Sequence, residues 1–541
     1  MPGSILEGPQ RLSQSILWKL QRRFFETQGI DAWRKSIVPH YITSNPFIAR
    51  SYSRIVSGFF RDCLAGNLIS YPDQPMYVIE LGAGSGRFSY HFLRSFLANA
   101  EFLRRNDGFR FRYIMSDFAP QTVAYWQSHP SLLPFVQEGH LAFARYDVGS
   151  DAIIELSGSQ QPLLPEEVRN PLVVIANYFF DGIPQDYFSI RCGELYEQLA
   201  GVHIDGGDAD QDAQDLLDRI QVDFESRPAS TDYYGDPDLD RLLDGYQHRL
   251  IDADILFPCS ALRCLRDLSR LSGGRMLLVS ADQGYSSEEE LLRQGTPEIR
   301  HHGSVSMLVN YHALGEYAQK CGGQVLHPGS NPSSLNVSCF VFGIPAAGTP
   351  ETRRVFDETV VQFGPDDFFS VKMGIEKAHE HMTLSQLLAY LRLGGGDADM
   401  LMGALPALTE LAQTCTDVER ADLKRALQQV WENYYPIGEE QDLPYEIGLL
   451  LYRSGWFGEA LEMFRHSQNL HNPRSWTLYN MGLCQYMLGE QESAQACMDE
   501  ALRLDPGCGD PPWKTAAESG PIDNGLSSTW TGGAAIRCEA K

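Results

Sequence analysis

Along the first 345 residues, short apolar runs alternate with stretches in which apolar residues recur at helical spacing. The run Pro171–Asn177 is apolar almost throughout, which is typical of a strand buried on both faces of a parallel sheet. Strands that alternate with helices predict an α/β fold, an open and mainly parallel sheet with flanking helices. The predicted strands are 77–81, 111–117, 142–148, 171–177, 275–282 and 336–342.

The segment before the sheet, residues 1–70, is predicted to be a helical lead-in. Residues 12–35 have an amphipathic pattern, and a second helix is expected after Pro46. The polar residues that end in Asn45 indicate a turn and a helix cap. The basic residues of 8–25, where no acid occurs, fit either a surface helix or a mitochondrial presequence.

A glycine turn follows the first strand of the predicted sheet. Glu80 precedes Gly82, Gly84 and Gly86, and Arg87 stands where the dinucleotide fingerprint needs a glycine. The pattern E/D-x-G-x-G-x-G is instead similar to the first motif of class I S-adenosylmethionine (SAM) methyltransferases; the alternative is a tight turn without a ligand. The residues expected to bind SAM here are Glu80, Gly82, Ala83, Gly84 and Gly86.

The next two predicted strands also end in acids. Asp117 is expected to accept hydrogen bonds from ribose hydroxyls, with Phe118 against the adenine, because ligands of doubly wound sheets bind beyond the carboxyl ends of the strands. Asp147 is expected to accept from the adenine amino group, with Val148 against the ring. A surface Asp147 that caps the next helix is the alternative.

Four stretches together carry a more specific resemblance: Tyr41–Pro46, Glu80–Gly86, Ala176–Pro184, and Asp282–Gly284 followed by Gly295-Thr296. Over residues 30–343 the chain resembles the MidA-like SAM methyltransferases, which include a mitochondrial complex I assembly factor that methylates a protein arginine. The family's pattern at the third stretch is Ala-Asn-Glu-hydrophobic-Phe-Asp-Ala-Leu-Pro, and Tyr178 stands at its Glu. Gln283 and Ser304 replace a Tyr and an Asp of the family.

Methyl transfer to an arginine needs groups that localise the guanidinium charge and later take a proton. Asp181 and Asp282, at the ends of two predicted strands, are the expected catalytic carboxylates. Asn177 is expected to fix the geometry and to contact the cofactor, since the methyl donor's sulfonium would lie just above this strand end. The site needs no metal.

Composition bounds the partners and the compartment. A chain of 541 residues predicts two or three domains, and the net charge of −26 argues against nucleic acid while permitting a basic protein substrate. No apolar run reaches the ~18 residues that cross a membrane. The 11 cysteines include no C-x-x-C pair, so neither a zinc site nor a disulfide framework is predicted. A reducing compartment follows, the cytoplasm, with the mitochondrion as the alternative.

Four further segments complete the predicted organisation. An acidic insertion at about 205–244 is predicted inside the methyltransferase domain 1–345, either as a disordered loop or as an electrostatic lip for a basic substrate. Residues 346–375 are predicted to be a linker and 376–506 a helical domain. The Gly- and Ser-rich stretch 507–541 predicts a disordered tail.

The helical domain contains a repeat. Gly448 and Gly482 lie 34 residues apart, as do Ala460 and Ala494. Small residues where two helices cross, at this period, are typical of tetratricopeptide (TPR) repeats, with two unrelated helical hairpins as the alternative. TPR arrays bind peptides or protein surfaces, so a protein or peptide partner is expected here.

These patterns together predict a SAM-dependent methyltransferase that acts on a protein side chain, with arginine as the candidate acceptor and with TPR repeats that recruit the substrate or a partner. Two alternatives stay open. One is a small-molecule methyltransferase whose repeats serve assembly. The other is a catalytically inactive SAM-binding scaffold, which Tyr178 suggests.

Overall fold

The computed structural model describes residues 4–99, 109–151, 153–158, 162–204, 216–301, 303–329 and 332–508. The chain divides into two compact units, Met1–Val371 and Lys372–Lys541. The predicted linker therefore belongs largely to the first unit, where helix α13 (Pro350–Phe356) packs against α4 (Pro46–Ala65). Two backbone N–H groups of Glu351 and Thr352 donate to Asp62 of α4 and fix this contact.

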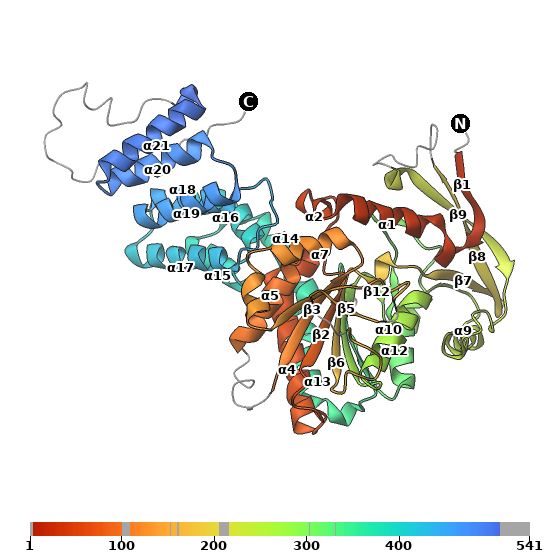
Figure 1. Ribbon diagram of the computed structural model, residues 1–541. Helices are drawn as coiled ribbons and strands as arrows, with labels where there is room; N and C mark the ends of the chain where they lie inside the picture. Colours follow the sequence, from red (N-terminus) through yellow and green to blue (C-terminus); the bar gives the residue numbers. More distant parts are fainter. Residues whose placement is uncertain are drawn as a thin grey trace, which may run out of the picture. The chain divides into compact units, whose positions relative to one another are not determined.

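The first unit is built on an eight-stranded sheet (Figure 1). Its order is β16-β17-β11-β6-β2-β3-β4-β5, and the five strands from β11 to β4 run parallel. Numbered along the chain, these five lie in the order 3-2-1-4-5 of a doubly wound sheet, so the predicted Rossmann-like fold class is confirmed. The strands are β2 (Met76–Leu81), β3 (Phe111–Asp117), β4 (Leu141–Arg145), β5 (Glu155–Leu156), β6 (Leu172–Asn177), β11 (Met276–Asp282), β16 (Gln324–Leu326) and β17 (Asn336–Phe342).

Helices pack on both faces of this sheet (Figure 1). On one side α4 packs against α5 (Arg87–Asn99), and on the other α10 (Cys259–Leu271) packs against α12 (Tyr311–Lys320). The side chain of Asn45 accepts from the first N–H groups of α4, which confirms the predicted cap. The other helices of the unit before residue 350 are α1 (Ile16–Gln28), α2 (Asp31–Arg34), α3 (Tyr41–Ser44), α7 (Pro120–Ser128), α8 (Leu133–Gln137), α9 (Pro237–Arg249) and α11 (Glu288–Leu291).

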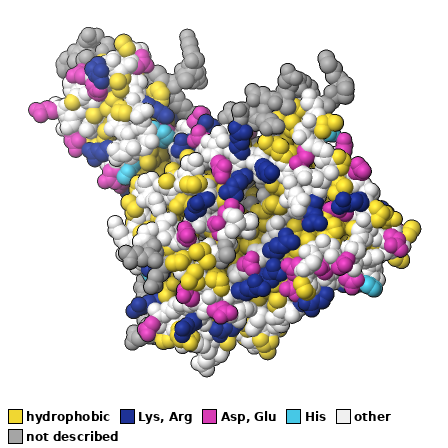
Figure 2. All heavy atoms as spheres, turned by 45° about the vertical axis from the view of Figure 1, so that its right-hand side comes forward, with side chains coloured by type: hydrophobic (Ala, Val, Ile, Leu, Met, Phe, Trp, Pro, Cys, Tyr) yellow, Lys and Arg dark blue, Asp and Glu magenta, His cyan; other side chains and the backbone are white. Residues whose placement is uncertain are grey.

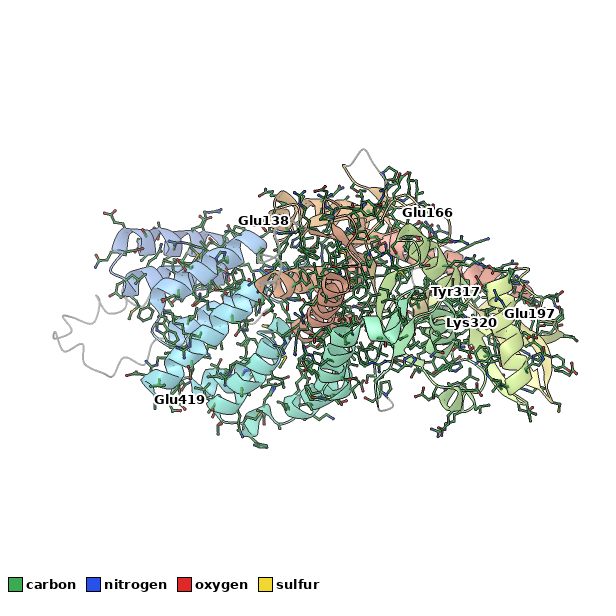
Figure 3. All side chains as sticks on the ribbon, turned by 90° about the horizontal axis from the view of Figure 1, so that it is seen from below. Glu138, Glu166, Glu197, Tyr317, Lys320 and Glu419 are labelled. Atoms are coloured by element: carbon green, nitrogen blue, oxygen red, sulfur yellow. The ribbon has the colours of Figure 1, made fainter. Side chains whose placement is uncertain are left out.

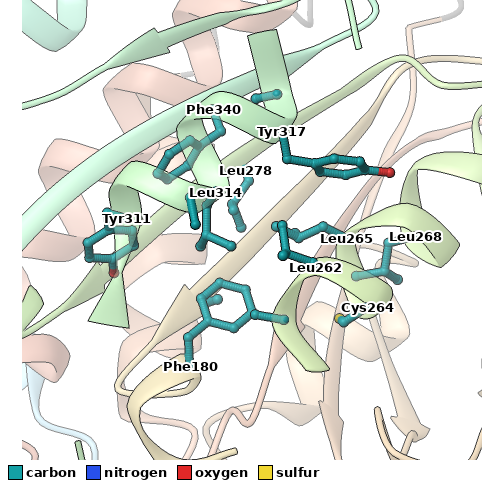
Figure 4. Close-up of a cluster of buried hydrophobic side chains, with 14 of the residues drawn as sticks. Phe180, Leu262, Cys264, Leu265, Leu268, Leu278, Tyr311, Leu314, Tyr317 and Phe340 are labelled. Atoms are coloured by element: carbon teal, nitrogen blue, oxygen red, sulfur yellow. The ribbon is translucent and has the colours of Figure 1, made fainter. Parts of the chain in front are cut away.

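The largest core cluster lies between the sheet and the second helical layer (Figure 4). Leu262 and Leu265 of α10, Leu314 of α12 and Leu278 of β11 are almost completely buried in it. Burial of such side chains is the main favourable term in folding, about 1.5–3 kcal/mol for each large apolar residue. Phe180, three residues after the end of β6, belongs to the same cluster and thus anchors the loop beyond that strand end.

A second, antiparallel sheet of five strands corrects the prediction for residues 205–244. Residues 205–215 lie outside the described residues, but the remainder forms β9 and α9, so a disordered loop is wrong from residue 216 onward. The strict alternation of Ile220, Val222 and Phe224 with polar residues is a strand signal that the acidic composition obscured. The strands are β1 (Ser4–Arg11), β7 (Asp186–Arg191), β8 (Glu194–Ile204), β9 (Ile220–Pro228) and β10 (Ala253–Phe257).

A buried acid ties the second sheet together. Glu197 of β8, which is labelled in Figure 3, accepts hydrogen bonds from Arg227 of β9 and from Tyr233. Its side chain is 2% exposed. Arg11, at the end of β1, lies 3.7 Å from the same carboxylate and stacks over the ring of Tyr233 at 4.0 Å. The N-terminal strand is thereby attached to the chain segment that follows β6.

Short elements link the two sheets. They are η1 (Leu12–Gln14), η2 (Phe180–Gly182), η3 (Leu217–Arg219), β12 (Gly284–Tyr285), β13 (Arg300–His301), β14 (Val305–Ser306) and β15 (Val309–Asn310). Three more helices, η4 (Ala346–Gly348), η5 (Asp357–Val361) and α14 (Pro365–Glu376), lie around α13 in sequence.

The net charge of −26 does not make the surface uniformly acidic, because Lys and Arg side chains gather among Asp and Glu on the face shown in Figure 2. In the described part of the chain, no helix has both the length and the apolar character to cross a membrane.

The second unit is helical and explains the 34-residue offset. A Cβ on Gly448 would lie 2.7 Å from the ring of Phe464, and one on Gly482 would lie 2.9 Å from the end of Met498. Both glycines therefore stand where two helices cross, as the repeat predicts. The predicted tail lies outside the described residues from 509 onward. The elements are η6 (His379–His381), α15 (Leu384–Leu393), α16 (Ala398–Leu411), α17 (Asp417–Asn433), α18 (Leu443–Arg453), α19 (Phe457–Leu470), α20 (Ser475–Met487), α21 (Gln491–Leu504) and η7 (Pro506–Cys508).

Candidate functional site

A cavity of about 340 Å³ lies at the carboxyl ends of the parallel strands. Gly82 follows β2, Asp117 ends β3, Tyr178 follows β6, and Gln283 follows β11, so four neighbouring strands contribute to its wall. The order of the sheet reverses between β2 and β6, and this switch point is where doubly wound sheets bind their ligands. The volume is within the range of small-molecule sites, ~300–1,000 Å³.

The glycine turn forms one side of the cavity wall. Gly82 and Gly84 have φ of 60° and 53°, a conformation that residues with a Cβ seldom adopt. A Cβ at Gly82 would lie 2.8 Å from the ring of Phe179, and one at Gly84 would lie 2.8 Å from the ring of Trp33. Both positions therefore require glycine twice over, once for the backbone angle and once for the aromatic ring that packs on it.

Glu80 lies beneath the turn and not in the cavity wall. Its carboxylate accepts from the hydroxyls of Ser89 and Tyr113, the latter at 2.8 Å, so it joins β2, β3 and α5. Burial raises the pKa of Glu80 to about 7, against the lowering effect of these two hydrogen bonds. In this position Glu80 anchors the loop from inside, while Ala83 and Gly86 lie within the turn itself.

Asp117 is the acid that the cavity receives from β3. Its carboxylate accepts from the backbone N–H of Ala119 at 2.9 Å, and it is 7% exposed. Burial raises the pKa of Asp117 to about 6, and backbone N–H groups, including that of Gly84, oppose the rise. A carboxylate at this position can accept two hydroxyl donors from a bound molecule.

Arg22 contacts two of the residues that the sequence assigns to the adenine, Phe118 and Asp147. Arg22 of α1 donates to Asp147 at 2.5 Å, and its guanidinium group lies 4.7 Å from the centre of the Phe118 ring. Burial would raise the pKa of Asp147, but the hydrogen bond and charge of Arg22 hold it below its ordinary value. Val148 packs, half-buried, on the main core. None of these residues is among the described residues that line the cavity.

Asn177 ends β6 with a fixed orientation. The hydroxyl of Tyr52 in α4 donates to Oδ1 of Asn177 at 2.9 Å, and Nδ2 has no partner within the described ranges. The next residue, Tyr178, has a φ of 46°, which for a bulky side chain costs ~1–2 kcal/mol. The N–H of Tyr178 donates to the carbonyl of Ala281 at 2.9 Å and continues the sheet past the end of β6.

Asp181 and Asp282 come together from two strand ends. Asp181 lines the cavity, Asp282 is fully buried behind it, and the two carboxyl groups are within hydrogen-bonding reach of each other. Burial raises the pKa of Asp181 to about 7 and that of Asp282 well above its ordinary value, and the negative charge of Asp181 raises the latter further. The site therefore holds a buried pair of interacting acids.

The other side of the cavity comes from residues that sequence reasoning missed. Gln21 of α1 donates to the carbonyl of Gly182 at 2.9 Å and accepts from the N–H of Val305 at 3.2 Å. It thus ties the N-terminal helix to the loop after β6 and to strand β14. No motif points to these residues, because they meet the sheet only in the folded chain. The missed cavity residues include Gln21, Phe25, Trp33, Val38, Pro39, Arg300 and Met307.

Comparison with known proteins gives one family match, a tetratricopeptide repeat over residues 475–508, which covers α20 and α21. This confirms a TPR repeat near the C-terminus and indicates protein–protein interactions. No curated protein sequence matches the chain.

Several solved structures are similar to the chain. A protein from Burkholderia thailandensis bound to S-adenosyl-homocysteine has 18% identity and a TM-score of 0.33, with 53% of this chain and 63% of that chain covered. An uncharacterized protein from the same organism has 16% identity and a TM-score of 0.37, with 62% of this chain and 89% of that chain covered. The 1,6-didemethyltoxoflavin-N1-methyltransferase of that organism has 10% identity and a TM-score of 0.29, with 62% and 94% covered. At these TM-scores the likeness does not extend to substrate or mechanism.

Proposed function

We propose that this chain is a SAM-dependent methyltransferase that acts on a protein side chain recruited through the TPR region. The observation that carries the proposal is the cavity at the switch point of the sheet, where the glycine turn, Asp117 and Asp181 meet. An antiparallel strand, β17, lies between β11 and β16, and this also favours a methyltransferase over a dinucleotide-binding enzyme, because the dinucleotide-binding strand order 3-2-1-4-5-6 has no such inserted strand.

The residues present fit SAM at its polar end. The turn from Gly82 to Gly86 would hold the amino-acid part through backbone groups, and Asp117 would accept from the ribose hydroxyls. At the adenine end Phe118 and Asp147 have the right chemistry, although Arg22 engages both. SAM supplies an electrophilic methyl group on its sulfonium sulfur.

The chain's own residues would position the acceptor and take its proton. Asp181 borders the cavity and would accept a hydrogen bond from the acceptor. Asn177 is not among the described residues that line the cavity, and its buried amide N–H has no partner in the described structure. Holding the reactants near attack distance supplies ~7–11 kcal/mol of the barrier reduction in well-oriented reactions. Aromatic side chains, among them Phe25 and Trp33 with rings 5.9 Å apart, would keep water from the cavity.

The test uses SAM with a labelled methyl group, the purified full chain and a cell lysate. Gly84→Arg is the variant expected to disrupt the glycine turn that would bind the cofactor. Gly273→Arg, at a glycine with open space around it, is the control substitution. Label on a protein band that needs an intact Gly84 supports the proposal. Label confined to small molecules supports the second candidate, a small-molecule methyltransferase. The N-terminal residues that line the cavity, among them Phe25 and Trp33, favour this candidate because they cover the site.

A catalytically inactive scaffold is a third candidate, because Tyr178 replaces the Glu of the MidA-like pattern in a strained backbone conformation. SAM binding by calorimetry without any label transfer would favour it. Transfer that appears in Tyr178→Glu would then show that this one side chain suppresses the reaction.

A further inference from the structure

The strongest unexplained feature of the molecule is the fully buried carboxyl group of Asp282, which lies beside the loop that carries Asp181, because its Oδ2 accepts from the backbone N–H of Phe180. Two ionised carboxylates offer only acceptors, so they hydrogen-bond to each other only if one carries a proton. Both side chains lie beyond the carboxyl ends of neighbouring strands, Asp181 in η2 after β6 and Asp282 at the end of β11. Their proximity is therefore built into the central sheet.

The partners of each oxygen indicate where the proton is. Oδ2 of Asp282 accepts from the backbone N–H of Phe180 at 3.2 Å, with the hydroxyl of Tyr311 at 3.5 Å. Oδ1 of Asp282 receives no hydrogen bond from any donor in the described ranges, although the side chain is fully buried. A buried carboxyl oxygen without a donor is satisfied if it carries a hydrogen itself and donates it.

We propose that Asp282 keeps a proton at neutral pH and donates it to Asp181, so that Asp181 is the ionised member of the pair and Asp282 its positioning residue. This inference rests on the proposed methyltransferase function for its role, but the protonation of Asp282 is a property of the folded chain alone. Burial and the charge of Asp181 both raise the pKa of Asp282. Arg300 also stands near Asp181 and favours its ionised form.

The tyrosines near the pair are neutral at neutral pH. Tyr178, Tyr52 of α4 and Tyr311 of α12 have pKa values raised by burial, so each keeps its hydroxyl hydrogen. Arg300, at β13, is the positive group that acts on Asp181. Above the pKa of Asp181, about 7, the pair thus carries one negative charge, located on the side chain that faces the cavity.

The pair then has a defined part in the reaction. The acceptor nitrogen or oxygen forms a bond to the methyl carbon, and the electron pair of the broken carbon–sulfur bond goes to sulfur. The proton lost by the acceptor moves to Asp181 and from there to water. The proton of Asp282 stays in place throughout and holds the Asp181 carboxylate in one orientation.

Three variants of the full chain test this assignment by their methyl-transfer rate. In Asp282→Asn an amide N–H replaces the carboxylic O–H as the donor to Asp181, so most of the rate and the same acid limb of the pH profile are expected. Asp181→Asn removes the proton acceptor and is expected to lower the rate ~10²–10⁴-fold. Asp282→Leu keeps the branched outline of the side chain, although it is somewhat larger, and loses the donor, so a lower rate with unchanged SAM affinity by calorimetry is expected. If Asp181→Asn is active and Asp282→Asn is not, the proton is on the other residue, and the proposal is overturned; it is overturned as well if both are fully active.

A second measurement separates this proposal from the proposed function. At about pH 8, where most of Glu80 and Asp117 ionise, the infrared spectrum of the wild type is expected to contain the C=O band of a protonated carboxyl group. The band is expected to disappear in Asp282→Asn and to persist in Asp181→Asn. If the chain shows this band pattern but transfers no methyl group, the proton assignment holds and the proposed methyltransferase function is wrong. If the band of the wild type is still present in Asp282→Asn, the proton assignment is wrong.

Discussion

The guanidinium group of Arg22 lies 4.7 Å from the centre of the Phe118 ring and donates to Asp147 at 2.5 Å. A planar, hydrogen-bonding cation therefore occupies the ring face and the acceptor that the sequence assigns to adenine. The face and the carboxylate cannot serve both groups at once. SAM binding at this position requires Arg22 to move away.

The first prediction is that Arg22→Ala binds SAM more tightly than the wild type. The wild type must break a cation–π contact of ~0.5–2 kcal/mol and an ion pair of ~0–1 kcal/mol before adenine can bind, and the variant does not. A gain of roughly tenfold corresponds to about 1.4 kcal/mol. Isothermal calorimetry with SAM measures it, and Lys19→Ala, an exposed basic residue of the same helix, is the control. Weaker binding by Arg22→Ala would mean that Arg22 holds the cofactor and does not compete with it.

The contact between Arg22 and Asp147 also shows why this part of the site escaped sequence reasoning. The two residues are 125 positions apart, as are Tyr52 and Asn177, and neither pair belongs to one motif. The apolar run of β6, the glycine turn and the cap at Asn45 were predictable, because each depends on residues close together in the chain. What brings α1 over the sheet is tertiary packing, which a local pattern does not encode.

The second prediction concerns Gly84, where two causes of strain coincide. Ala at Gly84 must adopt a φ of 53° and place its Cβ 2.8 Å from the ring of Trp33. Ala at Gly273 has the same backbone problem, with a φ of 60°, but open space around it. Gly84→Ala is therefore expected to lower the free energy of unfolding by more than Gly273→Ala, whose cost is the conformational ~1–2 kcal/mol alone. Denaturant unfolding of both variants measures the difference.

Trp33→Ala serves as the second half of that test. It removes the ring that the new Cβ meets, so the double variant Gly84→Ala/Trp33→Ala is expected to lose less stability than the sum of the two single variants. Additive losses would show that Trp33 does not restrict residue 84.

The third prediction is a pH dependence of stability that originates at Glu80. Its pKa in the folded chain is raised to about 7 from an ordinary 4.5, so the folded state binds a proton more tightly than the unfolded state does. The contribution to stability is complete below pH 4.5 and is lost as the pH rises through about 7. Glu80→Gln is neutral at every pH and can still accept from Ser89 and Tyr113.

The expected result is a wild-type stability that falls more steeply with rising pH than that of Glu80→Gln, by ~1–3 kcal/mol across this window. Denaturation midpoints of the two proteins at a series of pH values measure it. Parallel curves would show that folding leaves the pKa of Glu80 unchanged. The control is Glu138→Gln, the same substitution at an exposed acid, the C-cap residue of α8.

The 34-residue repeat was predictable because its signal is local: a glycine in one helix and a large apolar residue in the next. The second sheet was not, although β9 alternates clearly, because its acidic composition also fits a solvated loop. Composition and periodicity gave opposite answers for the same residues there, and periodicity was right.

The last prediction distinguishes the two copies of the repeat. Gly448 faces the rigid ring of Phe464, with the would-be Cβ at 2.7 Å, whereas Gly482 faces the flexible end of Met498 at 2.9 Å. A ring cannot yield without moving its helix, but a methionine can change rotamer. Gly448→Ala is therefore expected to cost ~1–3 kcal/mol of stability and Gly482→Ala less, as measured by thermal unfolding followed by helical circular dichroism. Phe464→Leu makes room for the new methyl group, so Gly448→Ala/Phe464→Leu is expected to recover part of the loss relative to additivity. Equal costs at the two glycines would mean that the backbone near Ala494, 3.1 Å from the second Cβ position, matters as much as the ring does near the first.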